Sequence, residues 1–392
     1  MSKFLKYTGI SIILVIVALF IFTATSKYRI NILRDEIDCT IISKGCRDSR
    51  AIVIDENGEK YIAYKNYIKF IDINGKEEIT YKDENLDIED IEYASGSIYI
   101  ISKDILIKLY LEDKNTEVVL TNLPKGNIGV NRRLAFIGDK LYLTIPSKTN
   151  SGVLDGLTEE LAYDNNLGNA AIYQIDINKN EVKLYANGIR GINGIDYDNE
   201  GNIIAIFTGM KDEEERAVKR DRDYLYYVKE GQWYGWPDFS GGDKITSPRF
   251  KGEEEIQILV KDPPQKVVLA PIYQYEFVDA LKELSIDRDG TVLSENSIIF
   301  SDKKNKLIKV LDPEGFSYNI LKLNEHSNIV DIIYSGEEFL LLDSSLGCIY
   351  SIHKKDGFLG FRLPSIAWAV ILAFSFLLLI LVVYKISKKK VD

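Results

Sequence analysis

The chain has 392 residues, of which 46% are hydrophobic and 28% are charged, and its formal net charge is −10. It contains three Cys and only two His, His326 and His353. A three-His zinc site is therefore excluded, and a Ser-His-Asp or Cys-His arrangement would have to use one of these two residues. The charges outside residues 27–362 sum to +5, which leaves −15 on the middle of the chain. Such an acidic segment, without a Lys/Arg stripe, argues against nucleic-acid binding.

Apolar residues are concentrated at both ends of the chain. Residues 7–26 and 363–384 form uncharged runs of 20 and 22 residues. Each run is long enough, as a helix, to cross a bilayer core of roughly 30 Å. We expect a transmembrane helix in each, with an N-terminal tail at 1–6 and a basic tail at 385–392. The four Lys residues at 385, 388, 389 and 390 predict a cytoplasmic C-terminus. The protein is thus expected in the cell membrane, with its middle domain outside.

An alternative for the first run is a cleaved signal peptide, because Ala24-Thr25-Ser26 loosely resembles a small-residue cleavage site. Either interpretation leaves the domain outside and tethered by the second run. Residues 27–50 are expected to be a linker and residues 354–362 a juxtamembrane segment. A short-loop disulfide between Cys39 and Cys46 fits that compartment, and so do free thiols. Cys348 lies in an alternating segment that predicts a strand with a buried thiol.

A strand, a polar turn with Gly and a second strand recur between residues 51 and 353. This unit occurs six times, at Ala51 to Tyr64, Ile91 to Ile101, Leu134 to Thr144, Ile195 to Phe207, Leu284 to Phe300 and Val330 to Leu342. Six copies of a strand pair predict an all-β fold, a six-bladed β-propeller spanning 51–353. The uneven spacing predicts long insertions at Thr144 to Asn169 and Phe207 to Leu284, and loops of that length are often functional.

The segment Gly231-Gln232-Trp233-Tyr234-Gly235-Trp236-Pro237 is the most informative in the sequence. Its three large aromatic side chains offer flat faces that suit stacking on a sugar ring or a planar cofactor. The alternative is a packed loop that plugs a blade.

With Asp223-Tyr224-Leu225 before it, and Tyr185 to Arg190 followed by Gly194-Ile195 further upstream, this segment resembles the glucose/sorbosone dehydrogenase family. The similarity covers Leu134 to Pro237 and includes the upstream Leu134-Ala135-Phe136 and Lys140 to Leu143 strands. Members of that family are sugar dehydrogenases that use pyrroloquinoline quinone (PQQ). The resemblance implies a six-bladed propeller and, as cofactors, PQQ and Ca²⁺.

The sequence departs from the family at the residue that does the acid/base chemistry. The family has a His as general base just before the Leu-x-Phe strand, and the corresponding position here lies near Gly129, where no His is present. Arg190 is retained, but Gly191 and Ile192 replace the Asn and Pro that follow it in the family. His326 is expected on the surface or in blade packing, and His353 on the membrane-proximal surface.

These features predict a propeller without oxidoreductase activity that binds or senses a carbohydrate-like ligand or another component of the cell envelope. In this hypothesis Arg190 anchors an anion or hydroxyl, Asp223 orients a donor, and Trp233, Tyr234 and Trp236 stack on the ligand. One alternative is an active PQQ-dependent aldose dehydrogenase with a base from the Asp155 to Glu160 segment. Others are a calcium-dependent lactonase-like hydrolase and a propeller that only binds proteins.

Overall fold

The computed structural model describes residues 27–154, 156–213, 216–250, 252 and 256–355. The chain divides into one compact unit of Ile32–Lys354 and a second unit made of Met1–Asn31 and Lys355–Asp392. Within the described ranges no helix is long and apolar enough to cross a membrane. The expected spans at 7–26 and 363–384, together with the tails at 1–6 and 385–392, lie outside the described residues.

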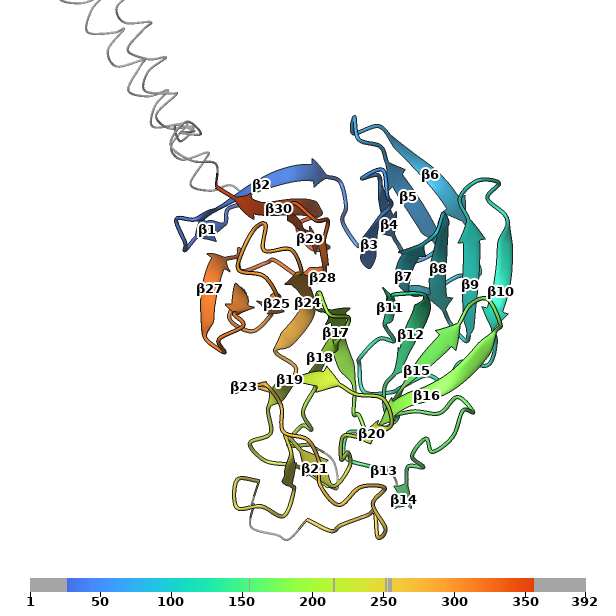
Figure 1. Cartoon of the computed structure of the whole chain (residues 1–392), viewed down its shortest axis with the longest axis vertical. Helices are drawn as coiled ribbons and strands as arrows, with labels where there is room; N and C mark the ends of the chain where they lie inside the picture. The colour runs from blue at the N-terminus through green and yellow to red at the C-terminus, as the bar shows by residue number, and fades with distance from the viewer. Residues whose placement is uncertain (1–26, 155, 214–215, 251, 253–255, 356–392) are drawn as a thin grey trace, which may run out of the picture. The chain divides into compact units, whose positions relative to one another are not determined.

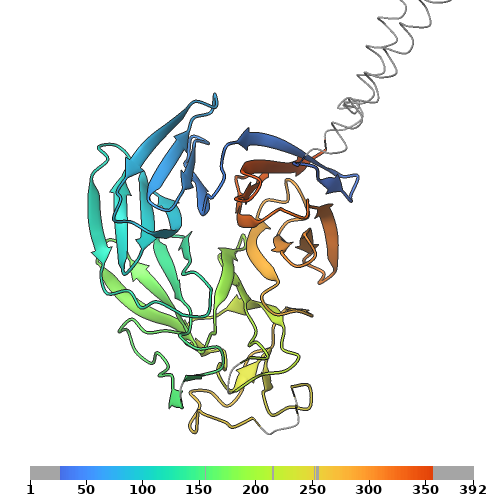
Figure 2. The ribbon, with the colours of Figure 1, turned by 180° about the vertical axis from the view of Figure 1, so that it is seen from behind.

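Strands form six mainly antiparallel sheets of at least four strands each, arranged around a common axis (Figures 1 and 2). Blade 1 contains β3 (Ala51–Ile54), β4 (Lys60–Ala63), β5 (Tyr67–Ile71) and β6 (Glu77–Lys82). Blade 2 contains β7 (Ile88–Ala94), β8 (Ser97–Ser102), β9 (Ile105–Tyr110) and β10 (Thr116–Leu120). Blade 3 contains β11 (Leu134–Ile137), β12 (Lys140–Ile145), β15 (Ala171–Asp176) and β16 (Glu181–Asn187), with β20 (Gln232–Trp233) added parallel to β16.

The second half of the ring follows the same order. Blade 4 contains β17 (Ile192–Tyr197), β18 (Ile203–Phe207), β19 (Asp223–Val228) and β23 (Tyr273–Tyr275). Blade 5 contains β24 (Leu281–Asp287), β25 (Ser297–Asp302), β26 (Leu307–Leu311) and β27 (Ser317–Lys322), and β1 (Asn31–Ile32) extends this sheet. Blade 6 contains β28 (Ile329–Tyr334), β29 (Phe339–Asp343), β30 (Cys348–Lys354) and β2 (Ile37–Lys44). The six predicted strand pairs are the two inner strands of the six blades, so the all-β, six-bladed prediction is confirmed.

The inner strands β3, β7, β11, β17, β24 and β28 contact one another in that order, and β28 contacts β3 to close the ring. Closure also comes from β2, which pairs with β30 as the outer strand of the last blade, with Ile37 opposite Lys354 and Lys44 opposite Cys348. The predicted linker at 27–50 is therefore corrected: the propeller begins before residue 51. Because the partner of β2 lies some three hundred residues away in sequence, no local pattern indicated this strand.

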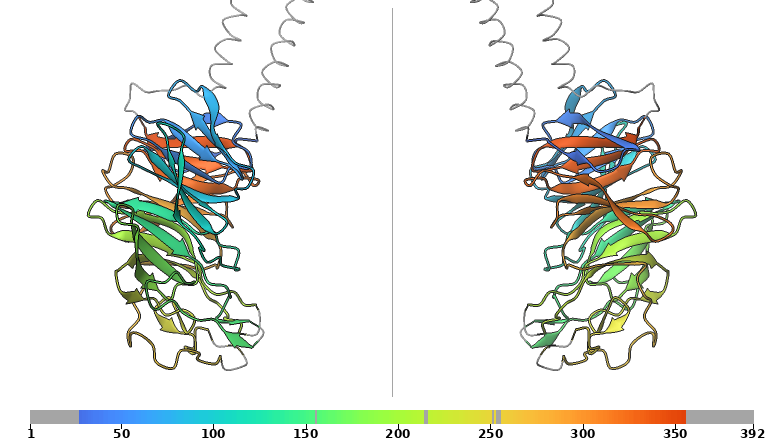
Figure 3. Two further views of the ribbon diagram at one scale, coloured as in Figure 1. Left: turned by 90° about the vertical axis from the view of Figure 1, so that its right-hand side faces the viewer. Right: turned by 90° about the vertical axis from the view of Figure 1, so that its left-hand side faces the viewer.

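Two long insertions leave the ring at blades 3 and 4. The first, between β12 and β15, contains β13 (Val153–Leu154) and β14 (Leu157–Thr158). The second, between β19 and β23, contains β20, β21 (Phe239–Ser240) and β22 (Asp243–Lys244). The predicted insertion from Phe207 to Leu284 thus includes two strands of blade 4. Both insertions lie at the rim of the ring beside blades 3 and 4 (Figures 1 and 3). Arg216 bridges them by donating to the Ser151 and Pro237 carbonyls.

Candidate functional site

A cavity of about 460 Å³ opens at one end of the central channel. We call it the mouth cavity. Its walls come from the first residues of the inner strands and the loops that lead into them, with the turn after β25. The lining residues used below are Ser49, Arg50, Lys125, Gly129, Lys282 and Lys303. This arrangement gathers on one cavity polar side chains from blades that are far apart in sequence.

A second cavity of about 320 Å³, the channel cavity, continues between the inner strands. Arg133 and Glu283 line both cavities and form an ion pair with each other at their junction. The channel cavity is also lined by four further carboxylates and one further guanidinium, namely Asp90, Glu92, Asp196, Asp331 and Arg288. It is therefore polar, and more of its charged groups are acids than bases.

Three of these carboxylates join neighbouring blades. Asp331 accepts a hydrogen bond from the Ile52 N–H (2.8 Å), and Asp90 accepts one from the Leu134 N–H (2.8 Å). Asp196 accepts one from the Ile286 N–H at 3.0 Å. An inner strand has a free edge whose N–H groups need acceptors away from bulk water. These acids supply acceptors at three of the six blade interfaces, so their first role is structural.

Burial perturbs the channel carboxylates strongly. It raises the pKa of Asp90 to about 6 and that of Asp331 to about 7, in spite of the nearby Arg133 guanidinium. The pKa values of Glu92 and Glu283 also rise, mainly through burial. Part of this cluster is therefore protonated near neutral pH.

Arg190 and Trp236 are both buried and both meet Asn150 in the first insertion. The Arg190 Nε donates to the Asn150 carbonyl and to its Oδ1, both at 3.1 Å, and Nη1 donates to Thr208 Oγ1 at 2.7 Å. The Trp236 Nε1 donates to the same Asn150 carbonyl at 3.1 Å. The gap beside these two side chains measures only about 20 Å³. Both residues thus fasten the insertions to blades 3 and 4.

Asp223 is completely buried and acts as an acceptor for the backbone. Its Oδ1 accepts from the N–H groups of Gly209 (3.2 Å) and Asp279 (3.0 Å). Its Oδ2 accepts from Ala280 (2.8 Å) and Leu281 (2.9 Å). Burial nevertheless raises the pKa of Asp223 to about 6. The carboxylate therefore holds the start of β24 against blade 4.

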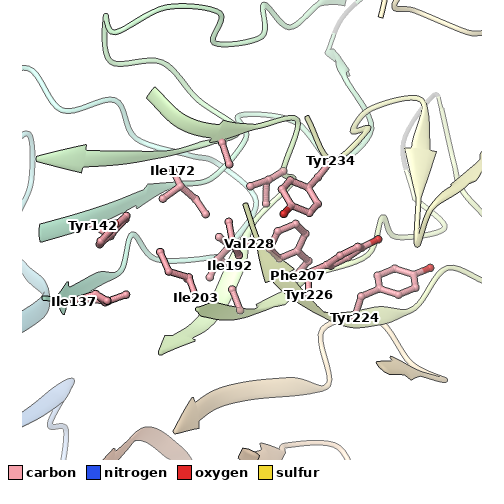
Figure 4. Packing of buried hydrophobic residues seen from close by; sticks show 14 residues of the cluster. Ile137, Tyr142, Ile172, Ile192, Ile203, Phe207, Tyr224, Tyr226, Val228 and Tyr234 are labelled. Atoms are coloured by element: carbon pink, nitrogen blue, oxygen red, sulfur yellow. The ribbon is translucent and has the colours of Figure 1, made fainter. Parts of the chain in front are cut away.

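Trp233 and Tyr234 are also parts of the packing. Trp233 is 1% exposed and lies edge-on to Phe239, with ring centroids 5.6 Å apart. The Tyr234 hydroxyl donates to the Tyr227 carbonyl at 2.8 Å, and its ring contacts Phe207 and Tyr226 in the cluster shown in Figure 4. The structure brings the predicted residues together around the insertions, but none of the five lines the mouth cavity.

Gly129 lies in the wall of the mouth cavity, where the resemblance implied the general base. Neither imidazole lines the mouth or channel cavity: His326 is exposed, and His353 lies on β30 beside Ser351. The polar residues that do line the mouth, such as Lys125, Lys282 and Lys303, were missed. Lys125 precedes blade 3 whereas Lys282 and Lys303 belong to blade 5, and the three residues share no sequence motif.

All three Cys residues have free thiols, so the expected Cys39–Cys46 disulfide is absent from the structure. Cys39 lies on β2, where it is opposite Ile352, whereas Cys46 lies in the turn after β2. The Cys46 thiol is 3.9 Å from the Ser43 hydroxyl.

No model of a protein family matches the sequence, and no curated protein matches it either. Solved structures do match in fold. The PQQ domain of pyranose dehydrogenase from Coprinopsis cinerea has a TM-score of 0.64 at 13% identity, covering 84% of this chain and 98% of that one. The PQQ-bound aldose sugar dehydrogenase from Streptomyces coelicolor has a TM-score of 0.59 at 14% identity, covering 83% and 98%.

The chain has the propeller fold of the PQQ-dependent sugar dehydrogenases. A Trichoderma reesei domain of carbohydrate-active enzyme family AA12 has the same fold, with a TM-score of 0.65 at 14% identity over 84% of this chain and 99% of that one. The resemblance inferred from Leu134 to Pro237 is thus extended to the whole propeller. An identity of 13 to 14% fits a divergent sequence with this fold. Because a fold does not fix the chemistry, the chemistry depends on the residues that line the mouth cavity.

Proposed function

We propose that this protein is a membrane-anchored receptor whose propeller lies outside the cytoplasm and binds a small, carbohydrate-like ligand in the mouth cavity without oxidising it. The observation that supports the proposal is a cavity of about 460 Å³, lined by hydroxyl, amide, ammonium and carboxylate groups from all six blades. A cavity of this size and polarity suits a sugar, whose hydroxyl groups need several hydrogen-bond partners.

One lining residue carries a hydroxyl without a partner. Ser49 is 3% exposed, and its hydroxyl has no hydrogen-bond partner among the described residues. A buried hydroxyl without a partner costs free energy. Its oxygen is closed to solvent, so a ligand supplies the partner once the side chain turns toward the cavity. We place a sugar hydroxyl at this part of the wall.

The lining does not fit the dehydrogenase chemistry of the sugar-dehydrogenase fold. Oxidation of a sugar by PQQ needs a side chain that accepts the hydroxyl proton, and the place that the resemblance gives to the family base lies near Gly129, which lines the cavity and has no such side chain. Two of the lining carboxylates are already held in ion pairs, Asp87 by Arg50 and Glu89 by Arg132. We therefore assign the cavity to binding.

The first test measures saccharide binding by full-length protein in detergent micelles, using calorimetry with a panel of neutral and acidic monosaccharides. We expect Ser49→Ala to weaken binding without lowering the temperature of thermal unfolding, because the hydroxyl has no partner within the described residues. Ser297→Ala is the matched control: its hydroxyl is also buried and unpartnered, but it lines neither cavity. Absence of binding to every sugar would reject the proposed function.

The second test addresses catalysis. We expect no reduction of an artificial electron acceptor when the same protein receives PQQ, Ca²⁺ and an aldose. Turnover above that of heat-denatured protein would reject a purely binding role and support the PQQ-dependent dehydrogenase.

The third test addresses the anchor. An N-terminal tag that persists in the mature protein is expected for two membrane spans, whereas loss of the tag would indicate a cleaved signal peptide. In intact cells, protection of a C-terminal tag from added protease is expected if residues 385–392 are cytoplasmic.

A further inference from the structure

The mouth cavity is locally cationic although the chain carries a net charge of −10. Five of its lining side chains are Arg or Lys and three are Asp or Glu, the full set being Arg50, Lys125, Arg133, Lys282, Lys303, Asp87, Glu89 and Glu283. An excess of positive charge in an acidic protein is a feature of this site and not of the surface as a whole.

Three of the five cations are neutralised by a carboxylate. The Arg50 Nη1 lies 2.7 Å from Asp87 Oδ1, and Arg133 pairs with Glu283. The Lys282 Nζ lies 2.7 Å from Asp279 Oδ1. These ion pairs leave little capacity for a ligand at Arg50, Arg133 and Lys282.

The other two cations are Lys125 and Lys303. The Lys125 Nζ is 3.9 Å from Glu89 Oε1, an atom that already accepts from the Arg132 Nη2 at 2.7 Å. The Lys125 side chain is 69% exposed. Lys303 forms no ion pair within the part of the chain that the structure describes, and it is exposed in the turn between β25 and β26. Two ammonium groups from separate blades are thus available to the same cavity.

We propose that the ligand of the mouth cavity is an acidic sugar, one that carries a carboxylate or phosphate group. Lys125 and Lys303 bind its anionic group, and the Ser49 hydroxyl bonds to a ring substituent. This inference rests on the proposed function and names the chemical class of the ligand. Hydrogen bonds between an ammonium and an anion are stronger than those between neutral groups, so the charge decides which sugar is preferred.

The test is a calorimetric titration of full-length protein in detergent micelles with glucose, glucuronate and glucose 6-phosphate at one ionic strength. We expect the two acidic sugars to bind about tenfold more tightly than glucose, the scale of one charge-assisted hydrogen bond. The preference is expected to shrink as salt is added. Comparison of the two acidic sugars distinguishes a carboxylate from a phosphate as the preferred group.

Lys303→Gln is expected to remove most of this preference and leave thermal unfolding unchanged. Lys304→Gln is the matched control, because its ammonium lies over the Phe277 ring and does not line the mouth cavity. Lys125→Gln is expected to act like Lys303→Gln.

Each other outcome contradicts the inference in a different way. Equal binding of glucose and glucuronate would overturn it and leave the proposed function intact, whereas no binding of any sugar would overturn both. Equal losses of the preference for acidic sugars in Lys303→Gln and Lys304→Gln would show that the preference comes from the general positive charge of this region and not from a binding site. PQQ is a tricarboxylate and could occupy the same site. If PQQ bound more tightly than every sugar, and if this binding required Lys303, the anion site would be assigned to the cofactor.

Discussion

Replacement of Asp223 by Asn separates a structural role from a role in ligand binding. The sequence predicted that Asp223 orients a donor at the ligand site, whereas in the structure its carboxylate accepts four backbone hydrogen bonds. An Asn side chain has the same shape but only one oxygen, so two of the four N–H donors lose their acceptor and face an NH₂ group. These donors belong either to Gly209 and Asp279 or to Ala280 and Leu281.

The size of the effect follows from the count of donors. A buried donor without an acceptor costs about 1 to 3 kcal/mol, so two such donors are expected to lower the free energy of unfolding by about 2 to 6 kcal/mol. Since domains are stable by only about 5 to 15 kcal/mol, Asp223→Asn is expected to be folded but markedly weakened.

Denaturant unfolding followed by tryptophan fluorescence measures this effect, because Trp233 and Trp236 are buried in the insertion that follows β19, the strand on which Asp223 lies. Asp243→Asn is the matched control: its carboxylate is 53% exposed and pairs with Arg249 at 3.3 Å, so a change below about 1 kcal/mol is expected. An unchanged unfolding free energy in Asp223→Asn, together with weaker sugar binding, would refute the structural role and restore the predicted one.

Three further predictions concern the channel, the aromatic loop and the thiols. Burial raises the pKa of Asp331 to about 7, so the folded protein binds a proton that the unfolded chain has already released above its ordinary pKa of 3.8. The stabilisation from this group is therefore full at about pH 4 and falls by roughly 2 to 4 kcal/mol as the pH rises to about 7.5. Asp331→Asn is expected to flatten the dependence of the unfolding free energy on pH. An unfolding free energy of the original protein that rises over this range would contradict the prediction. Gly188→Ala would place a methyl 2.2 Å from the Trp233 ring, whereas the methyl in the control Gly58→Ala, at a similar positive φ, meets open space. The temperature of thermal unfolding is therefore expected to fall far more in Gly188→Ala than in the control. Denatured, unreduced protein should present three reactive thiols, and a Cys39–Cys46 disulfide would leave only one.

The number of blades was predictable because each blade begins with two strands joined by a short turn. In the unit from Ala51 to Tyr64, for example, short runs of apolar, β-branched and aromatic residues flank Asn57-Gly58, and the structure pairs Ala51 with Ala63 and Ile54 with Lys60. Both the strand composition and the turn chemistry are local properties, so they are visible in the sequence. Closure of the ring by β2 was not predictable, because its partner β30 is remote in sequence.

The site was predicted less well, for the same physical reason. Trp233, Tyr234 and Trp236 form a recognisable segment, but their large apolar surfaces are more stable when buried against Phe239 and Phe207 than when exposed in a cavity. The sequence by itself determined the repeat, the aromatic segment and the absence of a His near Gly129. Only the tertiary structure decided which polar and charged side chains line the mouth cavity, because Ser49, Lys125 and Lys303 come together there only after the ring has closed.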